Sequence, residues 1–157
     1  MLKVFMKKKV LFVCTGNTCR SPLAEVWFNK CAADRGAMDL SACSAGICAV
    51  NGEEASYHSR CVADENNLDL EGFRSQMLTR ELLKTADLIV GMTDGHCRRI
   101  VAFAPDAAAK THRLLEFADG GEVSDPYGGT LADYRRCFES MRKAVEKLVD
   151  EIINSNI

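Results

Sequence analysis

Short apolar runs alternate along the chain with stretches in which apolar residues recur at helical spacing. Residues 9–14 and 87–92 hold the most continuous apolar runs, which are typical of strands buried on both faces. Residues 40–46 and 112–117 are two shorter segments that also predict strands. The pattern therefore predicts four strands spread through the chain.

The segments between these strands predict helices. Pro22 suits the first turn of a helix that ends near Gly36, with Ser21 as its expected N-cap. The final helix is expected to be long, because apolar residues between Tyr134 and Ile152 follow one helical face. The remaining expected helices cover residues 53–66, 81–85 and 94–103, and the final helix covers residues 131–153.

Strands that alternate with helices imply an α/β fold, here a doubly wound, four-stranded parallel sheet with helices on both faces. Ligands of such sheets bind beyond the carboxyl ends of the strands. We expect a single domain over residues 1–157, in which residues 1–7 are a candidate flexible N-terminal extension. Met6 is an alternative start to Met1.

Composition narrows the class of protein. The 157 residues are 47% hydrophobic and 27% charged, which favours a folded globular domain over disorder. The formal net charge of −2 argues against a general binder of nucleic acid or of membrane surfaces. No apolar run approaches the ~20 residues of a membrane helix, and the lysine-rich start lacks the cleavage site of a signal peptide.

Eight cysteines are scattered at irregular spacing. In a chain long enough to have a core, this favours reduced thiols over a disulfide framework, and we expect a cytoplasmic protein. A monomer is also expected. Cys14/Cys19 and Cys43/Cys48 share one spacing and could form a four-sulfur zinc site on paper. Structural zinc pairs are usually closer together, and Arg20 would add a cation, so we expect no metal.

The most informative segment follows the first predicted strand and reads Cys14-Thr15-Gly16-Asn17-Thr18-Cys19-Arg20-Ser21. Cys14 ends a buried strand, and its loop runs into the N-terminus of a helix. Free N–H groups and the helix dipole favour an anion there, and Arg20 adds a charged fork for two phosphate oxygens. A thiol in such a field is expected to be a thiolate at neutral pH. The loop therefore predicts a nucleophile facing an oxyanion cradle, with a buried structural thiol as the alternative.

The other loop residues are predicted to bind or shape the phosphate site. Gly16 permits close backbone approach or a positive φ angle, and Asn17 tolerates a left-handed conformation that would turn its N–H inward. Ser21 could donate a hydrogen bond to the Cys14 sulfur as well as cap the helix. The predicted phosphate-binding residues are Thr15, Gly16, Asn17, Thr18, Cys19 and Ser21.

Phosphoryl transfer also needs a general acid, because the departing group must be protonated. Asp125 is the best candidate, since Pro126 stiffens its loop and Tyr127 offers an aromatic wall for a substrate side chain. Asp-Pro alone is a common turn sequence. Three other aspartates stay alternatives on the sequence alone: Asp94, Asp119 and Asp133.

Cys-x5-Arg-Ser after the first strand, together with Asp-Pro-aromatic before the last helix, resembles the low-molecular-weight protein tyrosine phosphatase family. The match spans nearly the whole chain and includes Ser44-Ala45-Gly46 on the second strand. The resemblance implies one phosphatase domain, a phosphorylated protein substrate, and no metal or other cofactor. It implies Cys14 as nucleophile, Arg20 as phosphate clamp and Asp125 as acid. It also implies that Cys19 can form a disulfide with Cys14 under oxidation.

Within that family, Thr18, Gly128 and Met92-Thr93 followed by His96 look more like the branch that hydrolyses phosphoarginine. Many tyrosine-specific members carry a bulky aliphatic residue in place of Thr18, on which a phenyl ring packs. A guanidinium prefers a hydroxyl and a nearby carboxylate. Phosphoarginine is therefore the expected substrate, with phosphotyrosine as the alternative. Phe73 departs from the family, which usually has a histidine there that braces the loop asparagine.

Two other functions are compatible with the same loop. A thiol-dependent arsenate reductase needs further cysteines to pass a disulfide outward, and Cys97 has no close partner in the sequence. A non-catalytic phospho-group binding module would not need both a reactive thiol and an acid. His58, His96 and His112 have no spacing typical of a metal pair or a triad, so we expect no catalytic histidine. We expect His96 on an exposed helix and His112 at the start of a strand.

Overall fold

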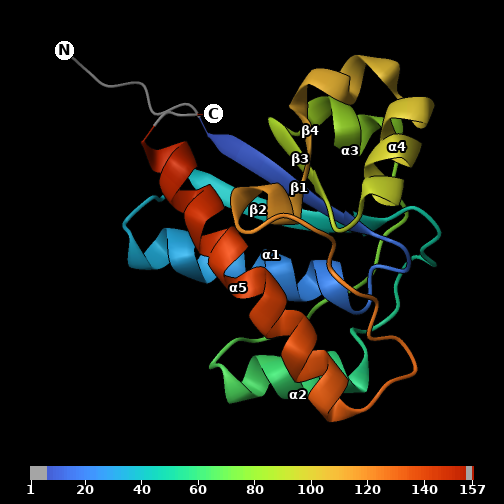
Figure 1. Cartoon of the computed structure of the whole chain (residues 1–157), viewed down its shortest axis with the longest axis vertical. Helices are drawn as coiled ribbons and strands as arrows, with labels where there is room; N and C mark the ends of the chain where they lie inside the picture. The colour runs from blue at the N-terminus through green and yellow to red at the C-terminus, as the bar shows by residue number, and fades with distance from the viewer. Residues whose placement is uncertain (1–6, 155–156) are drawn as a thin grey trace.

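Figure 1 shows the computed structural model of the chain, which describes residues 7–154 and residue 157. The expected N-terminal extension, Lys7 excepted, lies outside the described residues. The elements in chain order are β1 (Lys8–Cys14), α1 (Arg20–Asp34), β2 (Leu40–Gly46), α2 (Tyr57–Glu65), α3 (Arg80–Thr85), β3 (Leu88–Gly91), α4 (Asp94–Phe103), η1 (Pro105–Lys110), β4 (Thr111–Arg113), η2 (Leu114–Phe117) and α5 (Leu131–Ile153).

The four strands form one sheet in the order β2-β1-β3-β4, and every neighbouring pair is parallel. The chain moves outward from β1 to β2, then crosses back over β1 to β3 and β4. The direction of winding therefore reverses between β1 and β3. Open α/β sheets bind ligands at such a reversal, beyond the carboxyl ends of the strands. Cys14 is the last residue of β1, so the fold places it at this position.

Side chains of β1 alternate between two hydrophobic cores. Val10 and Phe12 face a large core that includes α1 and α5, whereas Leu11 and Val13 face a smaller core with α3, α4 and η1. Figure 1 shows α1 and α5 on one side of the sheet, with α3 and α4 on the other. Burial on both faces explains the continuous apolar run of β1. The predicted doubly wound sheet with helices on both faces is confirmed.

The helix expected over residues 53–66 begins later than predicted. Its first helical residue is Tyr57, because Ser56 is the N-cap and its hydroxyl oxygen accepts a hydrogen bond from the Ser59 N–H. Residues 53–56 therefore belong to the loop between β2 and α2. This difference matters for function, since that loop forms part of the candidate site described below.

The strand expected over residues 112–117 is also wrong in its extent. Only Thr111–Arg113 pairs with β3, and Leu114–Phe117 forms the 3-10 helix η2. The Glu116 carboxylate accepts a hydrogen bond from the Arg113 N–H at 2.8 Å, which turns the chain at this point. His112 is consequently the middle residue of β4 rather than the residue that opens a strand.

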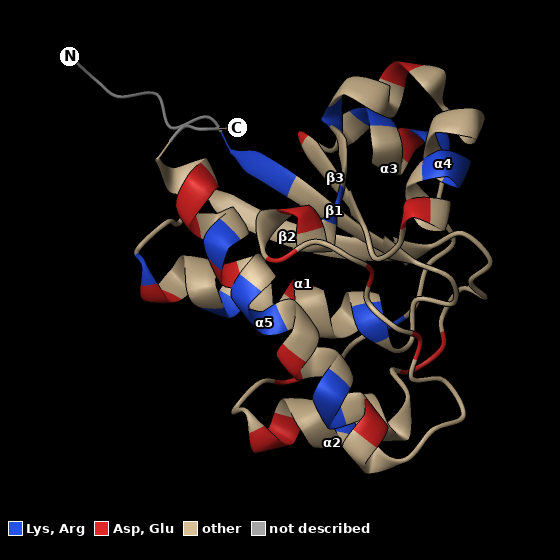
Figure 2. Cartoon of the chain, in the orientation of Figure 1, with Lys and Arg blue, Asp and Glu red and all other residues tan. Residues whose placement is uncertain are grey.

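The outer faces of the helices carry charges of both signs. Figure 2 shows lysines and arginines interspersed with aspartates and glutamates along α2, α4 and α5. Two ion pairs link separate elements: Arg135 of α5 lies 2.6 Å from Glu65 of α2, and Arg35, at the end of α1, lies 2.7 Å from Asp150 of α5. Among residues 7–154 and 157, no helix combines the length and apolar character that crossing a bilayer requires. The eight cysteines are free thiols.

Candidate active site

The loop after β1 directs its carbonyl groups outward. Three of these carbonyls accept hydrogen bonds from N–H groups of the β2–α2 loop. The Cys14 carbonyl accepts from Ile47 at 3.0 Å, the Thr15 carbonyl from Cys48 at 2.9 Å, and the Thr18 carbonyl from Ser56 at 2.8 Å. With the carbonyls occupied on the outside, the N–H groups of the loop are left for its inner face. This is the arrangement that an oxyanion cradle requires.

The loop depends on two backbone features. Asn17 adopts φ 56°, the left-handed conformation that the sequence predicted, whereas Gly16 has no positive φ. A side chain at Gly46 would place its Cβ 2.5 Å from the Thr15 carbonyl oxygen and 2.9 Å from the Asn17 nitrogen. Glycine at the end of β2 is therefore what lets the loop approach the sheet this closely.

Asn17 is fully buried, and its side-chain amide is held on every side. The amide nitrogen donates hydrogen bonds to the hydroxyl oxygens of Ser21 and Ser44 at 2.8 and 2.9 Å. The amide oxygen accepts one from the Gln76 N–H at 2.9 Å. Phe73, which stands where a bracing histidine was expected from the resemblance, packs instead against the large core. Two serines and a backbone N–H therefore hold this asparagine.

The directions of these hydrogen bonds determine what reaches the Cys14 sulfur. Because Ser44 accepts from Asn17, its own proton goes to the Glu25 carboxylate at 2.8 Å. Ser21 likewise accepts from Asn17, which leaves its hydroxyl proton for the Cys14 sulfur at 2.9 Å. Burial raises the pKa of Glu25, and the hydrogen bonds from Ser44 oppose that shift. The Cys14 sulfur thus accepts a hydrogen bond from an oriented hydroxyl group, and such a hydrogen bond stabilises a thiolate.

Ser21 does not cap α1, contrary to the sequence-based expectation. The helix begins at Arg20, and its N-cap residue Cys19 makes no side-chain capping bond. The other four α-helices are each capped by a side-chain hydroxyl, from Ser56, Thr79, Thr93 and Thr130. The first N–H groups of α1 are therefore left without a side-chain cap, next to the Cys14 loop, and are suited to an anion.

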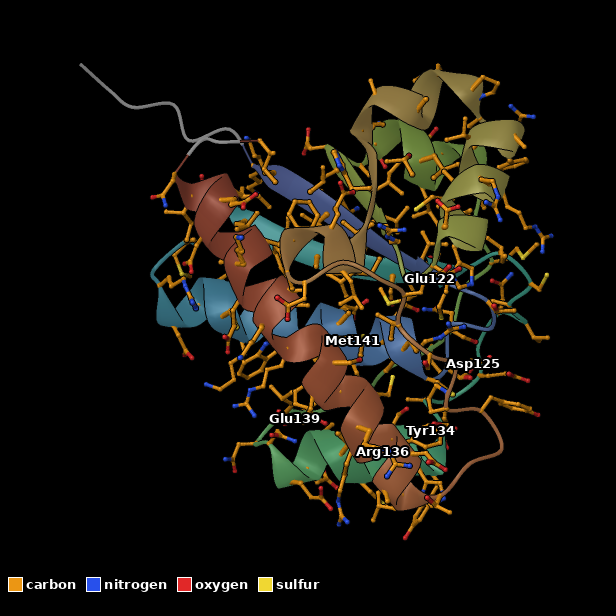
Figure 3. The ribbon with its side chains drawn as sticks, in the orientation of Figure 1. Glu122, Asp125, Tyr134, Arg136, Glu139 and Met141 are labelled. Atoms are coloured by element: carbon orange, nitrogen blue, oxygen red, sulfur yellow. The ribbon has the colours of Figure 1, made fainter. Side chains whose placement is uncertain are left out.

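The loop before α5 brings a carboxylate to the buried arginine. Arg20 is 4% exposed and donates a hydrogen bond from Nη1 to the Val123 carbonyl at 3.1 Å. Its Nη2 lies 3.6 Å from Oδ2 of Asp125, while Oδ1 of that carboxylate accepts from the Tyr127 N–H at 3.1 Å. Figure 3 shows Asp125 on this loop, beside the start of α1. The predicted clamp and the predicted acid therefore lie side by side.

The aspartates that the sequence left as alternatives are engaged or placed elsewhere. Asp94 pairs with Arg98 at 2.5 Å, within the first turn of α4. Asp133 accepts hydrogen bonds from Thr130 and so caps α5. Neither of these residues, nor Asp119, lines the pocket around Cys14. Among the described residues, Asp125 is the aspartate that lines the same pocket as the Cys14 thiol.

These groups meet in a pocket of about 280 Å³. Its lining residues are Cys14, Thr15, Gly16, Thr18, Cys19 and Arg20 from the first loop, Cys48, Val50 and Glu53 from the β2–α2 loop, and Asp125 and Tyr127. Tyr127 is 80% exposed, so its ring is free to contact a substrate. The side chains of Asn17 and Ser21 are buried behind the loop and shape it. Phosphate binding through the backbone N–H groups of these two residues stays a prediction. Cys48, Val50 and Glu53 of the β2–α2 loop were not predicted as pocket residues from the sequence.

Cys19 is buried between the Cys14 loop and α5. Its sulfur lies 3.3 Å from the Tyr134 hydroxyl and 3.6 Å from the Ser56 hydroxyl, and Figure 3 shows Tyr134 on α5. Burial, together with the hydrogen bond to Cys19, raises the pKa of Tyr134 to about 12. The disulfide between Cys14 and Cys19 under oxidation stays a prediction. Cys97 donates a hydrogen bond to the carbonyl of His112 at 3.4 Å, outside the pocket.

The contact of His96 with the Cys14 loop was not predicted from the sequence, and the expected exposure of this residue was wrong. The ring is 5% exposed and lies between two threonines, with Nε2 2.9 Å from Oγ1 of Thr15 and Nδ1 3.0 Å from Oγ1 of Thr93. Burial, reinforced by the nearby Arg20 cation, lowers the pKa of His96 to about 4. A neutral imidazole therefore joins the start of α4 to the Cys14 loop.

This buried histidine predicts a loss of stability in mild acid. The unfolded chain binds a proton at His96 below about pH 6.5, whereas the folded chain does so only near pH 4, so stability is full above about pH 6.5 and falls towards pH 4. Thermal melts of the parent and of His96→Gln at about pH 7 and about pH 5 test this. The parent should lose more Tm than the variant, by on the order of a few degrees. Equal losses would contradict the buried neutral ring.

The chain resembles known proteins along nearly its whole length. The family model described as low molecular weight phosphotyrosine protein phosphatase matches residues 9–156. A protein-arginine-phosphatase of Geobacillus stearothermophilus is 34% identical over 149 residues, which are 94% of this chain and 97% of that protein. The low molecular weight protein-tyrosine-phosphatase PtpB of Staphylococcus aureus is 38% identical over 146 residues, 92% of this chain and 99% of PtpB.

Solved structures show the same similarity. The YwlE arginine phosphatase from Geobacillus stearothermophilus superposes with a TM-score of 0.87 at 32% identity, covering 95% of each chain. A low molecular weight protein tyrosine phosphatase from T. tengcongensis also gives a TM-score of 0.87, at 39% identity, covering 92% of this chain and 99% of that one. Proteins named for two different substrates thus resemble this chain equally well in fold.

Proposed function

The chain belongs to the low-molecular-weight phosphotyrosine protein phosphatase family and is a protein phosphatase, and we propose that it hydrolyses phosphoarginine side chains through a cysteinyl-phosphate intermediate. The observation that carries the proposal is the meeting of Cys14, Arg20 and Asp125 in one pocket, from two segments that lie far apart in the chain. A nucleophile, a cation for the phosphoryl oxygens and a proton donor are the three parts that this reaction needs.

In the first step the Cys14 thiolate attacks phosphorus, and the bond from phosphorus to the leaving nitrogen breaks. Asp125 gives its proton to that nitrogen, so the group departs neutral at this atom. Arg20 and the N–H groups of the loop hold the phosphoryl oxygens as charge shifts onto them. The Ser21 hydroxyl, 2.9 Å from the sulfur, stabilises the thiolate before attack.

In the second step a water molecule attacks the phosphorus of the cysteinyl-phosphate. Asp125, now a carboxylate, takes a proton from this water, and the bond from phosphorus to sulfur breaks. Inorganic phosphate leaves and the Cys14 thiolate is restored. The position of Asp125 beside Arg20 suits both steps, because the arginine holds the phosphoryl group within reach of the carboxylate.

Two observations favour phosphoarginine as the substrate. Thr18 lines the pocket, and its side chain carries a hydroxyl where an aliphatic residue would present only methyl groups, which suits a polar, planar guanidinium. Relatives in Geobacillus stearothermophilus and Bacillus subtilis are named protein-arginine-phosphatases. Phosphotyrosine is the second candidate, because the exposed ring of Tyr127 at the pocket could stack on a tyrosine side chain and because PtpB relatives are named for tyrosine.

Replacing Thr18 with isoleucine should shift the substrate preference. The change removes a hydroxyl and adds methyl surface, so kcat/KM should fall for phosphoarginine and rise for phosphotyrosine. One such contact is worth roughly 10–200-fold in discrimination. The measurement is kcat/KM on two peptides that differ only in the phosphorylated residue. Thr18→Ser, which keeps the hydroxyl, is the matched control and should retain the preference of the parent.

The same two peptides test the proposal on the parent enzyme. A higher kcat/KM for the phosphoarginine peptide is the expected result. A parent that prefers the phosphotyrosine peptide would overturn the phosphoarginine assignment and leave the cysteine chemistry standing. If Thr18→Ile changed kcat/KM equally for both peptides, Thr18 would affect catalysis without selecting the substrate.

A further inference from the structure

The β2–α2 loop brings a second carboxylate to the pocket. Three residues of this loop line it: Cys48, Val50 and Glu53. Asp125 supplies a carboxylate from the loop before α5, and the mechanism uses that group as acid and base. Glu53 lies in the same pocket and has no role in the two steps described above.

The backbone of Glu53 is fixed to the neighbouring segment. Its N–H donates to the Ser75 hydroxyl at 2.9 Å, and its carbonyl accepts from the Ser75 N–H at 2.8 Å. Gly52 adds a hydrogen bond from its N–H to the Ser75 carbonyl at 2.9 Å. Ser75 is 3% exposed, and the next residue, Gln76, donates its N–H to the Asn17 side chain. One segment therefore positions both the Cys14 loop and Glu53.

The charge of Glu53 is available to a ligand. Its neighbour Glu54 lies 3.8 Å from both Arg60 and Arg74, so two arginines compensate that carboxylate. Glu53 makes no ion pair with any residue that the structure describes. Glu54 is therefore paired with arginines, whereas its neighbour Glu53 lines the pocket and has no ion-pair partner among the described residues.

We propose that Glu53 determines specificity by binding the cationic leaving group of phosphoarginine. The inference rests on the proposed function. With the phosphoryl group held by Arg20 and the loop, the group attached to phosphorus meets the pocket walls that carry Asp125 and Glu53. A phosphorylated guanidinium keeps a positive charge and presents N–H donors to carboxylates. A phenyl ring has neither, so Glu53 attracts one substrate and not the other.

Glu53→Gln tests the proposal, with Glu54→Gln as a control that removes the same charge one residue away. For Glu53→Gln, kcat/KM on the phosphoarginine peptide should fall about 2- to 5-fold, mostly through a higher KM, because Glu53 is exposed and an exposed ion pair contributes modestly. Activity on the phosphotyrosine peptide should be unchanged or higher. Raising the salt concentration should reduce the effect. Glu54→Gln should change neither substrate.

Three results would overturn the proposal. Equal effects of Glu53→Gln and Glu54→Gln would show a general influence of net charge, and the proposed function would stand if the parent still preferred phosphoarginine. A parent that does not hydrolyse phosphoarginine would sink both claims together. The third result would come from kcat/KM on phosphotyrosine peptides with and without flanking lysines. If Glu53→Gln lowered kcat/KM only when those lysines were present, Glu53 would bind residues beside the phosphorylated one.

Discussion

Cys14→Ser should abolish turnover while the fold and phosphate binding remain. A serine hydroxyl is not ionised at neutral pH, so it cannot replace a thiolate as nucleophile. The expected loss in kcat is about 10⁴-fold or more, the scale seen when an enzyme loses its nucleophile. The side chain is 2% exposed and changes by one atom, so β1 and the loop should keep their structure. Arg20 and the N–H groups of the loop should still bind inorganic phosphate.

The measurements are kcat on the phosphopeptides, titration with inorganic phosphate, and a thermal melt. Cys137→Ser is the matched control, because Cys137 is also buried but lies outside the pocket that contains Cys14. Burial raises the pKa of Cys137 to about 12, so this residue is a thiol at neutral pH. The control should keep most of the activity. A Cys14→Ser enzyme that retained a tenth of the parent rate would rule out the covalent mechanism.

Asp125→Asn should slow the first step by ~10²–10⁴-fold, the usual contribution of general acid–base catalysis. An asparagine keeps the oxygen that accepts the Tyr127 N–H, so the loop should hold its shape. The substitution removes the proton that the carboxyl group donates and the negative charge that lies 3.6 Å from Arg20. The loss should be smaller for a phosphate ester whose leaving group needs no proton.

Pre-steady-state rates on a series of leaving groups check this prediction. Asp119→Asn, in an exposed residue of the same long loop, is the control and should leave the rates unchanged. An equal loss for every leaving group would assign Asp125 a structural role, such as holding Arg20, instead of proton transfer.

The parts of the account that the sequence could predict are those encoded locally. The apolar run of β1 is continuous because both of its faces are covered, so its burial is visible in the sequence. The Cys14 loop lies within seven residues between a strand and a helix, and its chemistry follows from that order. The capping box at Thr130 and Asp133 likewise marks the start of α5, which begins at the predicted residue.

The parts that the sequence could not predict depend on contacts between distant segments. His96 was expected at the surface, because nothing near it in sequence shows that Thr15 lies 2.9 Å away. The hydrogen bond between Ser21 and Cys14 was predicted, but the capping role of Ser21 was wrong, since the helix already begins at Arg20. Glu53 was placed in a helix, although Ser75 fixes it in a loop. For His96 and Glu53, the partners Thr15 and Ser75 come from distant segments of the chain.

The most direct test of the mechanism is to trap the intermediate. The parent enzyme is mixed with a phosphoarginine peptide, quenched within milliseconds in alkaline denaturant, and mapped by mass spectrometry. The account predicts a phosphoryl group on Cys14 that forms in a burst and disappears as substrate is used up. Turnover without any phosphoenzyme, or a phosphoryl group on another residue, would contradict the central claim.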